Sequence, residues 1–566
     1  MRISTRSTRL LLPAFLLSAS AAGAGYATTF RNFNSKGLQV TRFDTGGDAV
    51  DAHDGEIALF DGLYYLYGTS YDCGYQWGVA GAPFCGFKAY SSPDMVHWTD
   101  RGFLFDAETP AWQGRCNGNT YGCYRPHVLY NASTRKYVLW INVYDNRVGF
   151  RVFTSPKPAG PFVEIAVPAL AVNNDAPVAG LNNGDHDTFL DDDGKAYIAY
   201  TDWRTGGGIV IERLDSTYQS GSGSHVKAVT PGATEAPSLF RRGGTYYVTY
   251  SDPNCGYCAT GTSYRTASAP LGPWSQGVKV TANSCGGQPA FVTPVGLGSG
   301  TAYLYGSDLW NNRAKNEALA NYYWAPLAFA ADGAIQPIVC QDSVTLQLAA
   351  GSAGSQDPAP PDLDNSSGIS GFTTFCDIKG GIQRSQSFVA TRTGTLSGVS
   401  FTTFQDSHPN AAMQIGIHLA NAAFQPTGPA LSTSTIPSTS IGWSPRQINI
   451  KPEIQVTAGT RYAMVVKSTT TTGCYGMEYN DSSPYPAGGA AYSNNSGSTF
   501  SAEAGRTLKF TTRISTPTGL NHSRNTPLRG KRPRIGTRHG EKPDGSEVDL
   551  VGSRKPNGAI RVRRLP

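Results

Sequence analysis

The stretch GDHDTFLDDDGKAYIAYTDW, residues 184–203, places an acidic turn between two alternating apolar runs. The Asp-Asp-Asp-Gly segment at 191–194 is typical of a tight hairpin turn, because Asp and Gly tolerate the positive backbone angles that such turns need. The tyrosine-rich run after it predicts a β-strand. Asp187 precedes the turn, at the start of the first strand, so turn formation does not account for it.

The same tyrosine strand recurs four more times along the chain. Each copy has a polar turn with Gly or Lys, an apolar strand before that turn, and a tyrosine at a matching place after it. These tyrosines are Tyr65, Tyr137, Tyr197, Tyr247 and Tyr303. Helical periodicity is nearly absent, and units of about four strands repeated every 50 or so residues are typical of propeller blades. The repeats predict a five-bladed β-propeller; the alternative is a β-sandwich whose hairpins merely look alike.

The whole chain is predicted to be all-β, with two folded domains. The propeller covers residues 28–349, and a Pro/Ser/Gly-rich linker follows at 350–368. Strand signals over residues 369–515 predict a jelly-roll-like β-sandwich. Residues 516–566 are poor in apolar side chains and cannot bury enough surface to offset their ordering entropy, so we expect a disordered basic tail.

The N-terminus has the composition of an export signal. Three arginines precede the apolar run LLLPAFLLSASAAGA, and small residues near Ala24 or Ala27 offer cleavage sites. A signal anchor is the alternative, but the run is too short for a membrane span and no other segment is long and apolar enough. Residues 1–27 are therefore left out of the predicted fold, and we expect a secreted or periplasmic protein.

Cysteine usage supports an oxidising compartment. Eight of the ten cysteines lie before residue 341 and two lie after it, so even numbers on both sides predict disulfides within each domain. The expected pairs are Cys73–Cys85, Cys116–Cys123, Cys255–Cys258 and Cys376–Cys474. CGYC at 255–258 could be a redox motif, but no βαβ pattern surrounds it. No Cys/His spacing resembles a zinc site.

The formal charge of +6 comes from the two ends of the chain. Residues 516–566 carry 12 basic and 4 acidic groups, and residues 1–27 carry three arginines and no acid. Residues 28–515 hold the remaining 32 basic and 37 acidic groups, a net charge of −5. A mildly acidic body gives no indication of nucleic-acid binding.

Three acids occupy matching positions in three of the repeats. Asp54, Asp187 and Glu235 each lie just before or within the strand that leads to a repeat tyrosine. Because the inner strands of a propeller line one central channel, we expect these carboxylates to meet. Glycoside hydrolysis needs two opposed carboxyl groups, one protonated to donate to the leaving oxygen and one ionised to activate water. A third acid beside the donor raises the donor's pKa, because like charges disfavour ionisation.

The sequences around these acids resemble the three acidic motifs of glycoside hydrolase family 43. The matching text is DGLYYLYG after Asp54, DHDTFLDDDGKAYIAYTD around Asp187 and TEAPSLFRRGGTYYVTYSD around Glu235. Members of that family are five-bladed propellers that cleave arabinosyl, xylosyl or galactosyl linkages with inversion. The resemblance, over residues 50–310, implies Asp54 as general base, Asp187 as pKa modulator and Glu235 as general acid. It implies no required cofactor; a structural ion in the channel would fit the fold, but the sequence reveals no ligand set for a metal.

The first motif departs from the family pattern. AHDG at 52–55 replaces the usual Ala-Asp-Pro and resembles the Ala-His-Gly-Gly of the exo-β-1,3-galactanase branch, which lacks the usual base. That branch has a glutamate where this chain has Tyr124 before Arg125, and a glutamine linked to water activation where this chain has Gln288. Whether Asp54 or Gln288 activates water is left open by the sequence.

Residues for sugar binding are expected beside these motifs, because aromatic faces stack on sugar rings and exclude water. The candidates are His53, Trp77, Tyr124, Arg125, His186, Trp203, Gln288 and Trp310. The two histidines among them are expected to orient other groups or to contact sugar rather than to bind metal.

The predicted function is an exported, monomeric, inverting exo-glycosidase that acts on plant-type polysaccharides or oligosaccharides. The alternative is a non-catalytic carbohydrate-binding propeller that keeps its acids for hydrogen bonds to sugars. The C-terminal sandwich is expected either to bind polysaccharide or to act as a structural cap. Its candidate stacking platform comprises Trp443, Tyr475, Tyr479 and Tyr485.

Overall fold

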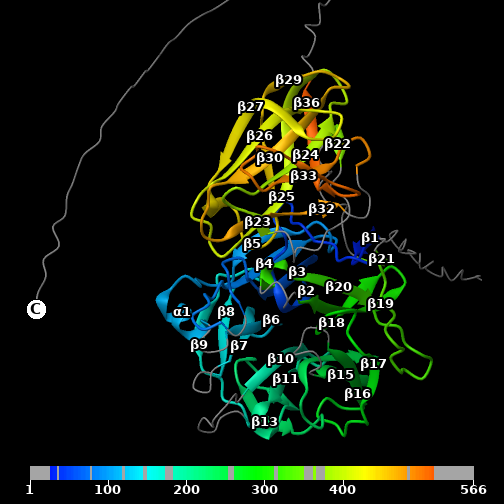
Figure 1. Ribbon diagram of the computed structural model, residues 1–566. Coiled ribbons are helices and arrows are strands. Elements are labelled where there is room, and N and C mark those ends of the chain that lie inside the picture. The colour runs from blue at the N-terminus through cyan, green and yellow to red at the C-terminus, as the bar shows by residue number, and fades with distance from the viewer. Residues whose placement is uncertain are drawn as a thin grey trace, which may run out of the picture. The chain divides into compact units, whose positions relative to one another are not determined.

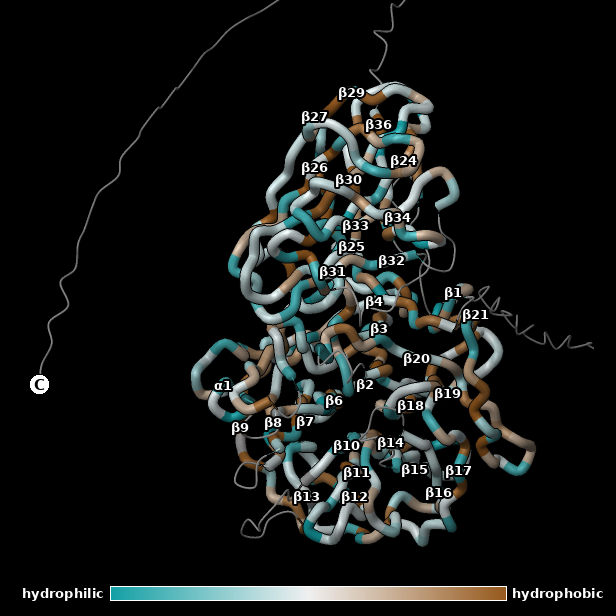
Figure 2. Tube along the Cα trace, in the orientation of Figure 1, coloured by the Kyte–Doolittle hydropathy of each residue, from teal (hydrophilic) through white to brown (hydrophobic). Residues whose placement is uncertain are grey.

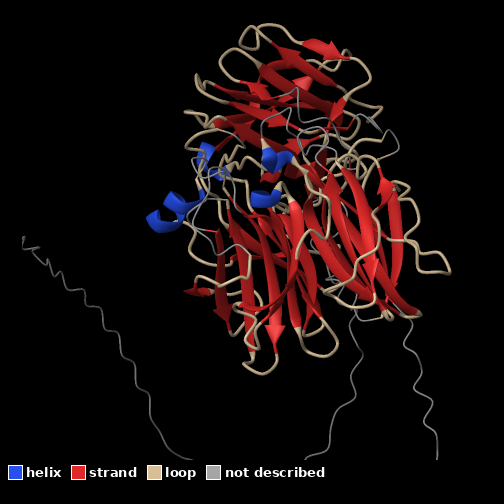
Figure 3. Ribbon diagram, turned by 90° about the horizontal axis from the view of Figure 1, so that it is seen from below, coloured by secondary structure: helices blue, strands red, loops and turns tan. Residues whose placement is uncertain are grey.

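A computed structural model describes the chain over residues 26–34, 37–76, 79–117, 122–144, 149–172, 183–252, 260–310, 316–349, 361–364, 376–480 and 485–515. These residues belong to one compact unit, Met1–Pro517; the second unit, Thr518–Pro566, lies outside the described residues. Strands predominate and helices are few and short (Figure 3), which confirms the all-β prediction. Within the described ranges, no helix has the length and apolar character needed to cross a membrane.

Four sheets between residues 53 and 281 each contain four antiparallel strands in chain order. Their first strands are β2 (His53–Phe60), β6 (Cys123–Asn131), β10 (Asn183–Leu190) and β14 (Glu235–Arg242). Their second strands are β3 (Leu63–Thr69), β7 (Lys136–Val143), β11 (Ala196–Asp202) and β15 (Thr245–Asp252). Their outer strands are β4 (Phe87–Ser92), β5 (Thr99–Phe103), β8 (Gly149–Ser155), β9 (Val163–Ala166), β12 (Gly208–Leu214), β13 (Gly221–Val226), β16 (Gly261–Ala267) and β17 (Val278–Thr281).

A fifth sheet joins the two ends of this region. It has the order β1-β21-β18-β19-β20. Its strands are β1 (Tyr26–Arg31), β18 (Gln288–Leu297), β19 (Gly300–Leu309), β20 (Asn321–Pro326) and β21 (Ser343–Leu348). The first strands of successive sheets contact one another in a closed cycle, β2 to β6, β10, β14, β18 and back to β2 (Figure 1). The arrangement is propeller-like, and the repeat tyrosines lie in β3, β7, β11, β15 and β19, as the repeat predicts.

The alternation within the tyrosine strands explains how the sheets stack. Leu139 of β7 packs in a buried cluster with Tyr67 of the preceding sheet, whereas its neighbour Trp140 packs with Ile198 of the following sheet. Ala199, next to Ile198, packs in turn against the fourth sheet. Because successive side chains of a strand point to opposite faces, one strand supplies both hydrophobic layers. These strands are accordingly apolar on both faces, with tyrosines near their ends.

Residues 361–515 form two larger sheets that share one hydrophobic cluster. The seven-stranded sheet contains β22 (Leu363–Asp364), β23 (Cys376–Ile378), β25 (Gly394–Asp406), β28 (Arg446–Ile450), β29 (Ile454–Val456), β31 (Cys474–Met477) and β36 (Phe510–Ser515). The six-stranded sheet contains β24 (Gln383–Val389), β26 (Met413–Ala420), β27 (Pro426–Ile436), β30 (Arg461–Ser468), β33 (Ala490–Ser493) and β34 (Ser501–Glu503). Hydrophobic and hydrophilic residues alternate along these strands (Figure 2). Strands β32 (Tyr479–Asn480) and β35 (Thr507–Leu508) pair separately.

The remaining elements of the described residues are one α-helix and three short 3₁₀ turns. They are α1 (Pro110–Cys116), η2 (Trp203–Thr205), η4 (Glu317–Leu319) and η6 (Ser438–Ser440). Of the predicted linker, residues 361–364 are described and include β22. The predicted export signal and basic tail lie outside the described residues, except that Tyr26 and Ala27 begin β1.

The disulfides follow the predicted pattern. Cys73–Cys85, Cys116–Cys123 and Cys376–Cys474 are bonded as expected. A fourth bond, Cys285–Cys340, was not among the predicted pairs. The predicted Cys255–Cys258 pair lies outside the described residues.

Candidate active site

The first strand of each of the five sheets begins with a break in pairing register. The breaks lie between His53 and Glu56, Tyr124 and His127, Asn183 and His186, Glu235 and Ser238, and Pro289 and Phe291. Such β-bulges redirect side chains and are frequent at functional sites. The bulges in the first three sheets contain Asp54, Arg125 and Asp185, whereas Glu235 and Gln288 lie at the edges of the last two.

The backbone at three of these bulges is left-handed. Asp54 and Arg125 both have φ 57° and Ala236 has φ 49°, a conformation that costs a non-glycine residue about 1–3 kcal/mol and persists only where the surroundings enforce it. A Cβ on the next residue, Gly55, would lie 2.1 Å from the carbonyl oxygen of Tyr67, so glycine is required there. The bulge thereby directs the Asp54 carboxylate toward the backbone of Arg125 in the neighbouring sheet.

The Asp54 carboxylate is almost fully buried, with 4% of its surface exposed. Its Oδ1 accepts hydrogen bonds from Thr69 Oγ1 at 2.8 Å and from the Arg125 backbone N–H at 3.2 Å. Its Oδ2 accepts one from the Tyr71 hydroxyl at 3.1 Å. The backbone N–H of Asp54 donates to Asp308 Oδ2 at 3.0 Å, which fixes the bulge itself. Three donors occupy three of about four acceptor positions of a carboxylate, so one remains for a water molecule.

Glu235 is buried beside a second acid, Asp185. The Tyr144 hydroxyl lies 3.4 Å from both Glu235 Oε1 and Asp185 Oδ1 and bridges the two carboxyl groups. The amide of Gln288 donates to Glu235 Oε2 at 3.5 Å and its oxygen accepts from Trp310 Nε1 at 3.1 Å. Glu235 is thus held by long contacts to neutral groups.

Arg125 joins the two acidic positions. Its Nη2 donates to Asp185 Oδ2 at 2.7 Å, while its backbone N–H contacts Asp54. Its Nη1 lies 3.4 Å from the carbonyl oxygens of Pro289 and Ala290 in the fifth sheet. Although burial acts to lower it, the pKa of Arg125 is raised by Asp185 and Asp54, so the guanidinium stays charged.

Burial and neighbouring charges raise the pKa of both candidate catalytic acids. Burial raises the pKa of Asp54 to about 7; Arg125 acts against this shift and Asp308 adds to it. Burial also raises the pKa of Glu235 well above its usual value, and the like charge of Asp185 raises it further. Two buried carboxyl groups with raised pKa values are typical of an acid/base site.

Aromatic side chains form one wall of this region. Tyr71 packs face to face with Tyr75 and edge to face with Trp310, with ring centroids 5.3 and 5.8 Å apart. The Tyr75 and Tyr124 hydroxyls are in very close contact. Tyr124 and Trp310, both predicted to bind sugar, are half-buried. Part of the surface of each ring is therefore exposed to solvent on this wall.

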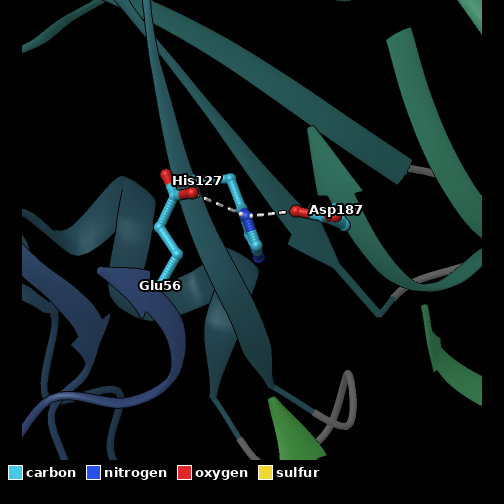
Figure 4. A group of neighbouring side chains, drawn as sticks. All are labelled: Glu56, His127 and Asp187. Carbon is cyan, nitrogen blue, oxygen red and sulfur yellow. Dashed lines mark ion pairs between the residues drawn. The ribbon is translucent and has the colours of Figure 1, made fainter. Parts of the chain in front are cut away.

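The Asp187 carboxylate, predicted to act on Glu235, is bonded to His127 and to the backbone of Leu239. Its Oδ1 lies 3.0 Å from His127 Nδ1, and its Oδ2 accepts the backbone N–H of Leu239 at 2.6 Å. Glu56 Oε2 lies 3.5 Å from the same His127 nitrogen (Figure 4). The physical reason is the bulge in β10, which leaves Asp185 at the strand start and Asp187 deeper in the strand.

Glu56, His127 and Asp187 are the one group of such side chains, among the described residues, whose ligand atoms could hold a metal ion. The three atoms lie within 4.8 Å of one another. Burial acts to lower the pKa of His127, but Glu56 and Asp187 raise it to about 9. A protonated imidazole therefore balances the two carboxylates, and an ion of like charge would have to displace that proton.

The two histidines predicted to contact sugar are fully buried. His53 lies between Asp51 and Asp308, 3.6 and 3.4 Å from their carboxylate oxygens, and stacks on Tyr322. His186 packs against the His127 ring, with centroids 5.3 Å apart. With no exposed surface, both can orient other groups but cannot touch a ligand in this conformation.

Two tryptophans, Trp203 and Trp77, were also predicted to contact sugar. Trp203 is half-buried beside Gly184, since a Cβ on that glycine would lie 2.7 Å from Trp203 Nε1. Its indole therefore lies beside Gly184, the residue that precedes Asp185 in the chain. Trp77 lies outside the described residues.

The predicted stacking platform of the C-terminal sheets is wrong. Trp443, Tyr475 and Tyr479 expose 4%, 0% and 0% of their surface, and Tyr485 packs against the same hydrophobic cluster as Tyr475. Buried rings cannot stack on a polysaccharide. The aromatic residues of this region are instead part of its core or, for Trp443, of the cluster around Tyr71 and Tyr75.

Five residues of the site were missed from sequence. Each contacts a candidate catalytic acid, its backbone or the bridging tyrosine: Thr69, Tyr71, Tyr144, Asp185 and Asp308. Asp185 could have been found, because it lies in the same motif as Asp187 and matches the start of the strand as well. The other four lie in or just after β3, β7 and β19 and carry no local signal.

Comparison with known proteins agrees with the resemblance read from the acidic motifs. The family model for glycosyl hydrolases family 43 matches residues 49–325, which confirms it. A β-D-galactofuranosidase of Aspergillus niger is 28% identical over 230 residues, 39% of this chain and 62% of that protein. The match thus spans less than two thirds of that relative's length.

Solved structures with similar folds include two exo-β-1,3-galactanases. The enzyme from Clostridium thermocellum is 26% identical with a TM-score of 0.49, over 60% of this chain and 72% of that chain. The enzyme from Phanerochaete chrysosporium, solved with galactose, is 20% identical with a TM-score of 0.45, over 80% of this chain and 98% of that chain.

Proposed function

We propose, on the premise that residues 49–325 belong to glycosyl hydrolases family 43, that this chain is an exo-acting glycoside hydrolase that inverts the anomeric centre. The observation that carries the proposal is the buried pair of acids, Asp54 and Glu235, joined through Arg125 and Asp185. A non-catalytic carbohydrate-binding protein would have no need of two carboxyl groups held at raised pKa values.

Glu235 is assigned as the general acid that protonates the leaving oxygen. Asp185, rather than the predicted Asp187, is assigned as the pKa modulator, because its charge adds to the effect of burial on Glu235. The Arg125 guanidinium donates to Asp185 Oδ2 and holds this side chain in place beside Glu235.

Asp54 is assigned as the general base that activates water. Its carboxylate has one acceptor position left and can take a proton, whereas the Gln288 amide is bonded to Glu235 and Trp310 and cannot. Gln288 is assigned instead to the orientation of Glu235. This assignment retains a base where the exo-β-1,3-galactanase branch lacks one.

Galactosyl linkages are the proposed substrate class. The branch resemblance at AHDG, 52–55, and at Gln288 concerns a β-1,3-galactanase, and the matched relative is named a β-D-galactofuranosidase. Arabinosyl and xylosyl linkages, the other two predicted from the family resemblance, are the alternative substrates. Tyr124 and Trp310, which are half-buried beside the acids, are proposed to stack on the terminal sugar of a polysaccharide or oligosaccharide.

We also propose the number of propeller blades, the architecture of the C-terminal region and the compartment of the protein. The closed cycle of first strands supports a five-bladed β-propeller over residues 28–349, and the shared cluster of the two C-terminal sheets supports a β-sandwich over 369–515. The four disulfides seen among the described residues support a secreted or periplasmic enzyme, in keeping with the export signal predicted at the N-terminus.

A product screen tests the proposed function. The full chain is incubated with aryl glycosides of galactopyranose, galactofuranose, arabinofuranose and xylose, and with arabinogalactan, arabinan and arabinoxylan. We expect release of a single monosaccharide from a galactosyl substrate, with NMR of the fresh product showing an inverted anomer. Binding of these polysaccharides without any reducing sugar would replace the proposal by the carbohydrate-binding alternative.

The pH dependence of kcat/KM is expected to be bell-shaped. The rising limb should lie near pH 7, because the base Asp54 must be ionised and its pKa is raised to about 7. The falling limb should lie at higher pH, because Glu235 must stay protonated and its pKa is raised well above its usual value. Initial rates on a soluble aryl glycoside between about pH 4 and about pH 10 would measure both limbs. A rising limb near pH 4, the ordinary pKa of aspartic acid, would exclude Asp54 as the base.

A further inference from the structure

A short segment of the C-terminal sheets, residues 441–446, is bonded to the propeller-like region. This docking segment connects η6 to β28. The Ala49 backbone N–H donates to the Pro445 carbonyl at 2.8 Å, and the side chain of Asn316 donates to the Trp443 carbonyl at 3.3 Å. Arg446 Nε lies 2.9 Å from Asp48 Oδ1. Backbone, amide and charge contacts thus hold one segment at several separate points.

The central contact of the docking segment is Asp72. Its Oδ1 accepts hydrogen bonds from both the backbone N–H and the hydroxyl of Ser444, at 2.7 and 2.8 Å. A Cβ on Gly442 would lie 2.1 Å from the same oxygen, so only glycine fits against this carboxylate. Arg446 Nη2 lies 3.5 Å from Asp72 Oδ2. The docking segment therefore packs closely around the Asp72 side chain of the propeller-like region.

Asp72 is connected to the candidate base, Asp54, through its neighbour Tyr71. It follows Tyr71 in the chain, and the backbone N–H groups of both residues donate to the Asp51 carboxylate, at 2.9 and 3.1 Å. The Tyr71 hydroxyl in turn donates to Asp54 Oδ2. The docking segment is thus three contacts away from the carboxylate assigned to water activation.

The Trp443 ring supports the same tyrosine through packing. It belongs to a buried cluster with Tyr71 and Tyr75, against which Trp310 also packs. A Cβ on Gly74 would lie 2.7 Å from the Trp443 ring, so the indole covers the turn that follows Tyr71. Removal of this ring would leave a cavity behind the aromatic wall of the site, and the surrounding side chains would relax into it.

We propose that the docking segment completes the active site, with Trp443 and Asp72 as positioning residues that hold the Tyr71 hydroxyl on Asp54. The inference rests on the proposed function for its effect on rate, but not for its effect on the conformation of Tyr71. It assigns the C-terminal sheets a role on every substrate, however small. A separate polysaccharide-binding module would affect only polymeric substrates, because it acts by raising local concentration.

The test compares Trp443→Ala, Trp443→Phe and Ser444→Ala in the full chain, with a small soluble aryl glycoside that the wild type cleaves. We expect Trp443→Ala to lower kcat about 30-fold with KM changed less than about threefold, because the change acts on the base rather than on sugar binding. Trp443→Phe, which keeps a ring, should retain kcat within about threefold. Ser444→Ala, a mild change that leaves the core intact, should lower kcat about fivefold.

Thr41→Val is the matched interface control. Thr41 Oγ1 donates to Glu478 Oε1 at 2.9 Å, a contact between the same two regions that involves none of the docking segment. It should leave kcat unchanged within about twofold. Wild-type kcat in Trp443→Ala or in Ser444→Ala would overturn the proposal, as would an equal loss in Thr41→Val.

Hydrogen exchange separates this inference from the proposed function. We expect faster amide exchange over residues 70–74 in Trp443→Ala than in Thr41→Val, because the turn loses its cover. If the wild type cleaved no glycoside, the proposed function would fail and this measurement alone would decide the positioning role. Unchanged exchange over residues 70–74 overturns the inference whatever the activity.

Discussion

Replacing Glu235 by glutamine is expected to lower kcat/KM about 10³-fold on a galactoside with a poor leaving group, which is the usual range for loss of a general acid. Glutamine has the shape of the glutamate and keeps an oxygen for the Tyr144 hydroxyl, so the fold should be unaffected. Steady-state kinetics with a natural oligosaccharide, together with the melting temperature, would measure both effects.

The leaving group supplies the control for this variant. An aryl glycoside with a strongly acidic phenol needs no proton from the enzyme, so Glu235→Gln should retain most of its kcat on that substrate. Asp54→Asn should lose activity on both substrates, because water activation is needed in each. Equal losses of Glu235→Gln on good and poor leaving groups would show that Glu235 is not the acid. Unchanged hydrolysis of the oligosaccharide would end the assignment altogether.

Asp185→Asn is expected to move the falling limb of the pH profile to lower pH by about one unit or more and to reduce kcat about 10²-fold. The like charge that raises the pKa of Glu235 is lost, and the Arg125 guanidinium, which lowers that pKa, is no longer paired. Both changes favour ionisation of the acid, so the protonated form is depleted at lower pH than in the wild type.

Asp187→Asn is the matched variant two residues along the same strand. It removes a carboxylate from His127 and weakens the acceptor for the Leu239 backbone N–H, so we expect a loss of about 2 kcal/mol in the free energy of unfolding. The limbs of its pH profile should stay where they are. Chemical denaturation and rate-against-pH curves for the two variants would measure this contrast. A falling limb that moves in Asp187→Asn but not in Asp185→Asn would restore the role predicted from sequence.

The contrast between these two aspartates marks the limit of the sequence argument. Hairpins, their repeat and the tyrosine positions follow from alternation and turn residues, which act locally, and these predictions agree with the strands observed. Asp185 and Asp187 lie on the same strand and would share one face in a regular ladder. The bulge between Asn183 and His186 interrupts that ladder. No residue type in this stretch predicts a bulge.

The position of Trp443 is a second feature that the sequence does not predict. A tryptophan in a loop of a predicted sandwich can equally well stack on a ligand or pack against another part of the protein. Its partners, Tyr71 and Gly74, lie far away in the sequence and belong to a different set of sheets. Composition and periodicity describe one segment at a time, so contacts of this kind become visible only in three dimensions.

The pairing of β1 with β21 constrains the order in which the nascent protein can mature. Tyr26 faces Leu348 and Arg31 faces Ser343, so β1 has no ladder partner until almost the whole propeller-like region has been made. Until then its backbone groups form an open edge that can pair with another chain. Vectorial synthesis therefore leaves the fifth sheet incomplete until late, and we expect a factor that shields residues 26–31 during translation to raise the yield of correctly closed protein.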